Sequence, residues 1–228
     1  MILVAYPKSG LKWLQWMVCA YLHGDVDWLL ADEHVPNCQT VDEIEGHRVI
    51  RTHAPVDFAW TTTQRPVVHV VRDPRDVCVS YFHHMRKWGD IPASMEFPAF
   101  VDRFNAGTIY PHQAWSEYVR RWENRRAITV RYEQVLARPH HELLRVLELV
   151  DESDHARSMR AVRLARFERM RDLELIQHHH HVDLARSDPT QRTMRTGGAG
   201  GWRDWFDDGM LAAFMDVHGV TMRGMGYA

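Results

Sequence analysis

The first 22 residues constrain the fold of this chain more than any other stretch. Ile2–Tyr6 is a short run of apolar, β-prone residues, which predicts a buried strand. A tight turn follows, Tyr6-Pro7-Lys8-Ser9-Gly10-Leu11-Lys12-Trp13, and the apolar run Leu14–Leu22 then predicts a buried helix. A strand that passes through a turn into a helix is typical of the units that build parallel α/β sheets.

The turn has the composition of an anion-binding site. A helix N-terminus presents unpaired backbone N–H groups and a partial positive charge, so it favours an anion. Gly10 allows close approach of the backbone, Ser9 offers a hydroxyl group, and Lys8 adds a full positive charge. We predict a cradle for phosphate or sulfate; the alternative is an ordinary connection with a solvated Lys8. The spacing G-x-x-x-x-G-K-[ST] is absent, which disfavours an ATPase or GTPase.

Further strands and helices alternate along the chain. Strands are predicted at Arg48–Thr52, Pro66–Val71 and Ala127–Tyr132. The predicted helices are Gly10–His23, Pro74–Trp88, Phe97–Asn105, His112–Asn124, Pro139–Val150, His155–Arg166 and Asp208–His218. Four strands interleaved with helices predict an α/β fold of three layers, in which helices flank a central parallel β-sheet.

Two segments lack a periodic pattern. Asp25–Glu45 contains the breakers Pro36 and Asn37 and is expected to be irregular. Gln177–Arg195 is polar and aperiodic, and we expect it to be a mobile segment over the site.

Polar side chains follow the predicted strands at their carboxyl ends, where open α/β sheets bind ligands. Lys8, His53 and Arg72 occupy such positions, and Tyr132 closes the last strand. A neutral His53 could accept a proton from a substrate hydroxyl group. The chain has 16 histidines, so position alone does not establish a catalytic role.

Ser80, in the helix that begins at Pro74, and Arg72, just before it, could each have a purely structural role. Ser80 lies two turns into this helix and could simply be a small packing residue. Arg72 could form an ion pair with Asp76.

A second glycine-rich segment, Arg195–Phe206, could also hold an anion. Glycines at this density allow backbone N–H groups to curl around a ligand, and Arg195 adds a bidentate cation. The alternative is a flexible linker, but Trp202, Trp205 and Phe206 indicate that the segment docks.

Bulk properties exclude several classes. At 228 residues with a net charge of −2, we expect one domain spanning 1–228 and neither a nucleic-acid coat nor a polybasic membrane binder. No apolar run approaches the roughly 20 residues that span a bilayer, and no secretory signal is visible, so the expected location is cytoplasmic.

The cysteines and histidines indicate no metal site or disulfide scaffold. The three cysteines have no C-x-x-C spacing, and Cys19 and Cys78 are predicted to be buried thiols. The internal run His178–His181 is predicted to be an exposed loop rather than a metal site, and no metal is expected.

Taken in order, the motifs resemble the sulfotransferases that use 3′-phosphoadenosine 5′-phosphosulfate (PAPS). The family patterns are Y-P-K-S-G-T-T-W, K-T-H-x-P, R-x-x-x-D-x-x-x-S, Y-E-x-x-x-x-x-P, S-F-x-x-M and R-K-G-x-x-G-x-W. The matching residues are Tyr6–Trp13, Arg51–Pro55, Arg72 with Asp76 and Ser80, Tyr132 with Glu133 and Pro139, Phe167 with Met170, and Arg195 with Gly197, Gly200 and Trp202. The resemblance implies a P-loop NTPase-like α/β fold with a phosphate loop for PAPS.

The resemblance also implies roles for residues. His53 would be the general base on a hydroxyl group of a small-molecule acceptor, and Lys8 with Arg51 would stabilise the charge that develops as 3′,5′-adenosine bisphosphate leaves. The implied cofactor-binding residues are Lys8, Ser9, Gly10, Leu11, Lys12, Trp13, Arg72, Ser80, Tyr132, Phe167, Arg195, Thr196 and Gly197.

Five positions depart from the family pattern. Leu11 and Lys12 stand where two threonines are usual, so a hydroxyl contact to the 5′-phosphate is lost and Lys12 could supply a charge instead. Arg51 and Thr196 each replace a lysine, and Arg166 replaces a serine. A non-catalytic nucleotide-binding relative and another phosphate-loop transferase, such as a small-molecule kinase, therefore stay open.

The acceptor class is also open between a phenol, a sterol-like alcohol, a sugar and a natural-product hydroxyl group. Tyr21, Trp60, Phe82 and Trp88 either line an apolar acceptor pocket or belong to the core.

Overall fold

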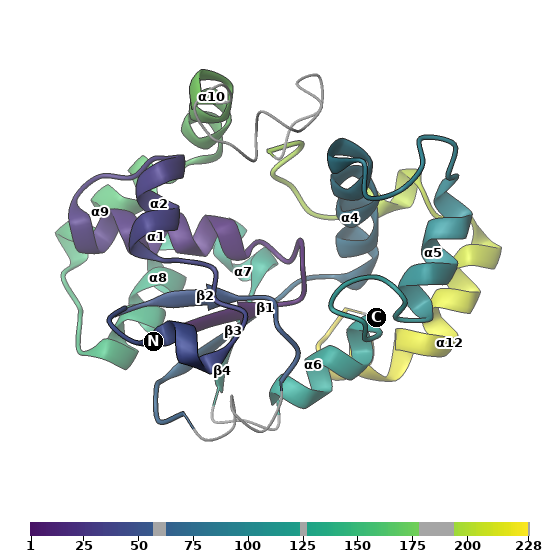
Figure 1. Ribbon diagram of the computed structural model, residues 1–228, viewed down its shortest axis with the longest axis horizontal. Coiled ribbons are helices and arrows are strands. Elements are labelled where there is room, and N and C mark those ends of the chain that lie inside the picture. Colours follow the sequence, from purple (N-terminus) through teal and green to yellow (C-terminus); the bar gives the residue numbers. More distant parts are fainter. Residues whose placement is uncertain (57–62, 124–126, 178–193, 228) are drawn as a thin grey trace.

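A four-stranded sheet forms the centre of the molecule (Figure 1). The computed structural model describes residues 1–56, 63–123, 127–177 and 194–227. The strands are β1 (Ile2–Ala5), β2 (Ile50–Thr52), β3 (Val67–Val71) and β4 (Ala127–Arg131), in the order β2-β1-β3-β4. All neighbouring strands are parallel, as the alternation of strands and helices predicted.

Helices cover both faces of the sheet, which confirms the three-layer α/β architecture (Figure 1). Consecutive residues of β1 point to opposite faces. Leu3 and Ala5 pack in one core with α1 (Leu11–His23), α8 (Pro139–Leu147) and α9 (His155–Leu164). Ile2 and Val4 pack in the other core; its helices are α4 (Pro74–Trp88), α5 (Phe97–Asn105), α6 (Trp115–Glu123) and α12 (Asp208–Gly224).

Shorter elements complete the described chain. They are α2 (Trp28–His34), η1 (Val41–Ile44), α7 (Tyr132–Ala137), η2 (Glu148–Val150), α10 (Phe167–Gln177) and η3 (Gly201–Asp204). The predicted mobile segment Gln177–Arg195 falls almost wholly outside the described residues, and so do His178–His181 and Trp60.

The expectation that Asp25–Glu45 is irregular was wrong, because this stretch contains α2. The Asp27 carboxylate caps the helix by accepting the Leu30 N–H at 2.8 Å. Gln15 of α1 donates to the carbonyls of Ala31 and Val35 at 2.7 and 2.8 Å. Two turns are too short to show a clear apolar period in the sequence, and contacts with α1 stabilise this helix.

Other boundaries also differ from prediction. The last helix continues past His218 to Gly224, because burial of Thr221 and Met222 outweighs the weak helix propensity of the residues before them. Tyr132 begins α7 instead of ending β4, and α6 begins at Trp115 rather than at His112.

The described cysteines are all free and buried, including Cys19 and Cys78 as predicted. Among the described residues, none of the helices combines the length and apolar character needed to cross a membrane.

Phe214 tests the core between α12 and its neighbours. Its ring is fully buried and stacks on Phe104, with ring centroids 5.7 Å apart. Phe214→Ala should lower the free energy of unfolding by about 3–5 kcal/mol, because it leaves a cavity in a packed core. Val220→Ala on the same helix, where Val220 is 74% exposed, should change it by less than about 0.5 kcal/mol. Equal effects of the two substitutions in urea denaturation would contradict this account of the core.

Candidate functional site

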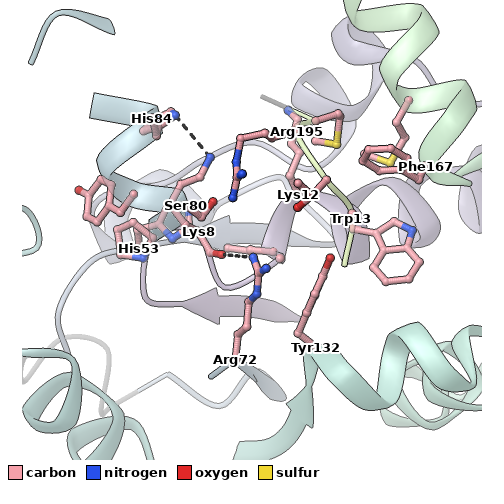
Figure 2. A pocket seen from close by; sticks show the side chains of 18 of the residues that line it. Lys8, Lys12, Trp13, His53, Arg72, Ser80, His84, Tyr132, Phe167 and Arg195 are labelled. Carbon is pink, nitrogen blue, oxygen red and sulfur yellow. Dashed lines mark hydrogen bonds between the residues drawn. The ribbon is translucent and has the colours of Figure 1, made fainter. Parts of the chain in front are cut away.

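The parallel topology brings the carboxyl ends of all four strands to one edge of the sheet, and a cavity of about 450 Å³ lies there (Figure 2). Every predicted site residue except Ser9 lines this cavity. The lining comprises Pro7, Lys8, Gly10, Leu11, Lys12, Trp13, Trp28, Arg51, His53, Arg72, Ser80, Tyr81, His84, Trp88, Tyr110, Tyr132, Leu136, Phe167, Met170, Met194, Arg195, Thr196 and Gly197.

The turn after β1 has an unusual backbone. Lys8 and Gly10 both have positive φ, at 71° and 95°. A non-glycine residue such as Lys8 is held in this region only when its surroundings impose it, and alternating backbone conformations of this kind aim N–H groups at an anion. Ser9 is buried under the turn, and its N–H donates to the Tyr6 carbonyl at 3.2 Å. The Ser9 side chain therefore does not face the cavity.

Tyr132 packs directly against this turn. A Cβ atom at Gly10 would overlap Cδ2 of the Tyr132 ring and lie 3.0 Å from its Cε2. The Arg72 guanidinium stacks over the same ring, 4.3 Å from its centroid. The Trp13 ring contacts it edge-on, with ring centroids 5.9 Å apart. The indole N–H of Trp13 donates to the Ala165 carbonyl at 2.8 Å, which fixes the indole at the cavity wall.

Arg72 connects the two predicted anion-binding segments. It donates to the Lys8 carbonyl at 3.3 Å and to the Gly198 carbonyl at 3.0 Å. Asp76, the alternative partner for Arg72, accepts instead the backbone N–H groups of Gly200 and Trp202, at 2.6 and 3.0 Å. The glycine-rich segment is thus docked on α4 and is not a free linker.

Phe167 of α10 meets this docked segment. A Cβ atom at Gly197, where φ is 65°, would overlap the Phe167 ring. Figure 2 shows Trp13 and Phe167 on one side of the cavity and His53, Lys8 and His84 on the other. The cavity therefore has an aromatic end suited to a flat ring and an end with titratable groups.

Lys8 lies between charged and imidazole neighbours. Burial, and then the positive charges of Arg72 and Lys87, lower the pKa of Lys8 to about 8. Its Nζ lies 3.4 Å from Nδ1 of His84, which also accepts the Trp88 indole N–H at 3.2 Å. Since both partners are donors, Nδ1 of His84 is the unprotonated nitrogen.

His53 has a defined tautomer. Its Nδ1 lies 2.7 Å from the Ala5 carbonyl oxygen, which can only accept, so Nδ1 carries the hydrogen and Nε2 has a free lone pair. Burial, followed by the charge of Arg51, lowers the pKa of His53 to about 4. The imidazole is therefore neutral near pH 7, with Nε2 unprotonated.

Sequence reasoning missed several lining residues, of which His84 makes the most significant contact. Ser80, His84 and Trp88 follow at intervals of four residues, which places them on one face of α4. This spacing is the signal that could have identified His84. Of the aromatic acceptor candidates, Trp88 lines the cavity, whereas Tyr21 and Phe82 are buried in the two cores.

The charge of the cavity indicates the ligand that it can hold. Five lysine and arginine side chains line it: Lys8, Lys12, Arg51, Arg72 and Arg195. Among the described residues, no carboxylate lines the cavity. The described residues contain no group of three or more histidine, cysteine, aspartate or glutamate side chains that could hold a metal ion. A cavity of this kind favours a ligand with several negative charges and an aromatic ring.

Gly10→Ala tests the contact between the turn and Tyr132. It should cost more stability than Gly24→Ala, because both residues have positive φ but only Gly10 has a side chain against its missing Cβ. Gly24→Ala should cost about 1–2 kcal/mol from backbone strain alone. Urea denaturation measures both variants, and equal losses would show that the Tyr132 ring moves without cost.

Comparison with known proteins finds relatives among the sulfotransferases. Mouse (Mus musculus) sulfotransferase 1B1 is 23% identical over 249 residues, which cover 98% of this chain and 82% of that protein. Bovine (Bos taurus) sulfotransferase 1E1 is 24% identical over 242 residues, covering 96% and 81%.

Solved structures share the fold. Retinol dehydratase in complex with androsterone and the inactive cofactor PAP superimposes with a TM-score of 0.77 at 19% identity, covering 97% of this chain and 80% of that one. Mouse sulfotransferase SULT7A1 complexed with PAP gives 0.76 at 20% identity, covering 98% and 83%. The sulfotransferase domain family model matches residues 1–226, and the chain therefore belongs to the sulfotransferase domain family.

Proposed function

We propose that this protein transfers a sulfuryl group from PAPS to a hydroxyl group of a small-molecule acceptor. The observation that carries the proposal is the placement of a neutral His53, with a free Nε2, in the same cavity as five basic side chains. PAPS carries its negative charges at two separate places, the 3′-phosphate and the 5′-phosphosulfate. Two related folds were solved with PAP, which supports this donor.

The turn after β1 and the glycine-rich segment would each bind one of the two charged groups of PAPS. Lys8 and the backbone N–H groups of residues 10–12 would bind the 5′-phosphosulfate, because they lie at the N-terminus of α1. Arg72, Ser80 and Arg195, with the backbone near Gly197, would hold the 3′-phosphate.

The aromatic end of the cavity would hold the adenine. Trp13 and Phe167 offer flat faces, and Tyr132 supports the turn beside them. Leu11 and Thr196 complete this wall of the cavity, whereas Lys12 lies in the turn that would bind the 5′-phosphosulfate.

The chemistry follows from the protonation states. Nε2 of His53 takes the proton of the acceptor hydroxyl group as its oxygen bonds to sulfur. The bond from sulfur to the bridging oxygen breaks, and the negative charge remains on that oxygen as 3′,5′-adenosine bisphosphate leaves. Lys8 and Arg51 stabilise this charge because both already line the cavity as fixed cations. A hydroxyl acceptor would lie at the end of the cavity that holds the titratable groups.

We also propose that residues 1–228 work as one domain.

Nucleotide selectivity tests the donor. 3′,5′-Adenosine bisphosphate should bind at least about tenfold more tightly than AMP, because charged hydrogen bonds to the 3′-phosphate contribute about 1.5–3 kcal/mol. Arg72→Ala should remove most of this difference. Calorimetric titration measures both ligands, and equal binding of the two by the wild-type protein would overturn the PAPS assignment.

His53→Ala tests the base. Turnover with PAPS should fall by about 10²–10⁴-fold, because Nε2 of His53 is the proposed proton acceptor, while affinity for 3′,5′-adenosine bisphosphate persists. His141→Ala is the matched control, since His141 is exposed on α8. A panel of phenols, sterol-like alcohols and sugars supplies the acceptor. Unchanged turnover would remove His53 from the mechanism, and nucleotide binding without turnover of any acceptor by the wild-type protein would indicate a non-catalytic relative.

A further inference from the structure

One carboxylate outside the cavity connects two of the cations that line it. Oδ1 of Asp32 lies 2.6 Å from Nζ of Lys12 and 3.2 Å from Nη2 of Arg51. The same oxygen accepts a hydrogen bond from the Gln15 amide at 3.0 Å. Lys12 and Arg51 both line the cavity, whereas Asp32 does not, so Asp32 acts on the site only through these neighbours.

The carboxylate is rigidly placed because α2 is fixed at several points. Gln15, which is fully buried, also donates to the carbonyls of Ala31 and Val35 and thereby ties α2 to α1. The indole N–H of Trp28 donates to the Met170 carbonyl at 3.3 Å and thereby ties α2 to α10.

Trp28 of α2 also restricts the position of the Lys12 side chain. The Trp28 ring lies under Lys12, with Nζ 4.9 Å from its centroid. Asp32 therefore meets Lys12 in one defined geometry.

The protonation states of Asp32 and Lys12 depend on each other and on the charge of Arg51. Although burial by itself raises the pKa of Asp32, Lys12 and Arg51 lower it to about 2, so the carboxylate is ionised at any ordinary pH. The pKa of Lys12 is lowered to about 8, chiefly by burial; the charge of Asp32 opposes this shift and the charge of Arg51 adds to it. Cys19 on α1 also faces Lys12, but burial raises its pKa to about 11 and leaves it a neutral thiol. Asp32 therefore keeps Lys12 protonated beside a second cation.

We propose that Asp32 is a positioning residue for donor binding: it holds Lys12 and Arg51 side by side, as paired cations, where the 5′-phosphosulfate would bind. Lys12 then supplies a positive charge, fixed in place by Asp32, where the family pattern has a threonine hydroxyl group. This inference rests on the proposed function, since the ligand of these cations is the 5′-phosphosulfate. It also explains why α2, whose sequence shows no clear pattern, is tied so closely to α1.

The first arm of the test needs no ligand. The rate at which an amine-reactive ester acylates Lys12 is followed by peptide mass spectrometry from pH 6 to 9 in wild-type protein, Asp32→Asn and Glu33→Gln. Glu33 is exposed on the same helix and serves as the matched control. Asp32→Asn should raise the rate at pH 7 about three- to tenfold, because a drop of one unit from a pKa of about 8 raises the unprotonated fraction at pH 7 about fivefold. Equal rates in all three proteins would overturn the proposal.

The second arm measures the affinity for 3′,5′-adenosine bisphosphate by calorimetry over the same pH range. Wild-type affinity should fall above about pH 8, as Lys8 and Lys12 lose their protons and bind an anion less well. In Asp32→Asn the fall should begin at lower pH, with affinity at pH 7.5 reduced about threefold or more. In a Lys12→Thr background, Asp32→Asn should no longer shift the profile, since the two residues act as a unit.

The outcomes separate the two proposals. A purely structural role of Asp32 would lower affinity equally at every pH. A shift that persists in the Lys12→Thr background would show that Asp32 acts on a group other than Lys12. Either result overturns the assignment. Should Asp32→Asn not fold, Lys12→Thr alone must remove part of the wild-type fall above pH 8, or the proposal fails. Absence of nucleotide binding by the wild-type protein would overturn the proposed function and with it the donor role of Asp32, while the labelling arm would still report the ion pair.

Discussion

The backbone turn between β1 and α1 is the constraint on which the rest of the site depends. Lys8 and Gly10 adopt positive φ, and the Tyr132 ring occupies the space that a side chain at residue 10 would need. Burial of β1 between β2 and β3 holds one end of the turn, and the packing of α1 against α9 holds the other. The strained backbone persists because both ends are fixed. The turn is thereby held in one conformation before any ligand arrives.

Electrostatics impose a second requirement, because five cations that share a cavity repel one another. The protein offsets this repulsion with acceptors placed just outside the cavity. Arg72 donates to the carbonyls of Lys8 and Gly198, while Asp32 holds the pair Lys12 and Arg51. Residual repulsion is visible in Lys8, whose pKa is lowered first by burial and then by Arg72. A multiply charged anion would relieve this repulsion, which is the physical basis of the proposed donor binding.

Much of the fold and site could be predicted because both are built from local patterns. The apolar runs predicted the four strands, and parallel pairing then required Lys8, His53, Arg72 and Tyr132 to meet at one edge. The prediction failed where local patterns are short or weak. The helix α2 has only seven residues and relies on Gln15, and α12 passes Gly219 because of packing. The order of motifs also predicted the family, which the match over residues 1–226 confirmed.

The sequence by itself determined the strand–turn–helix unit, the parallel sheet and the order of the anion-binding segments, because each depends on periodic burial and on backbone conformations encoded within a few residues. Only the tertiary structure decided the chemical states of the site. The Ala5 carbonyl selects the tautomer of His53, His84 meets Lys8 across 76 positions, and Asp32 joins Lys12 to Arg51. These contacts link residues far apart in the chain, so they exist only once the layers have packed.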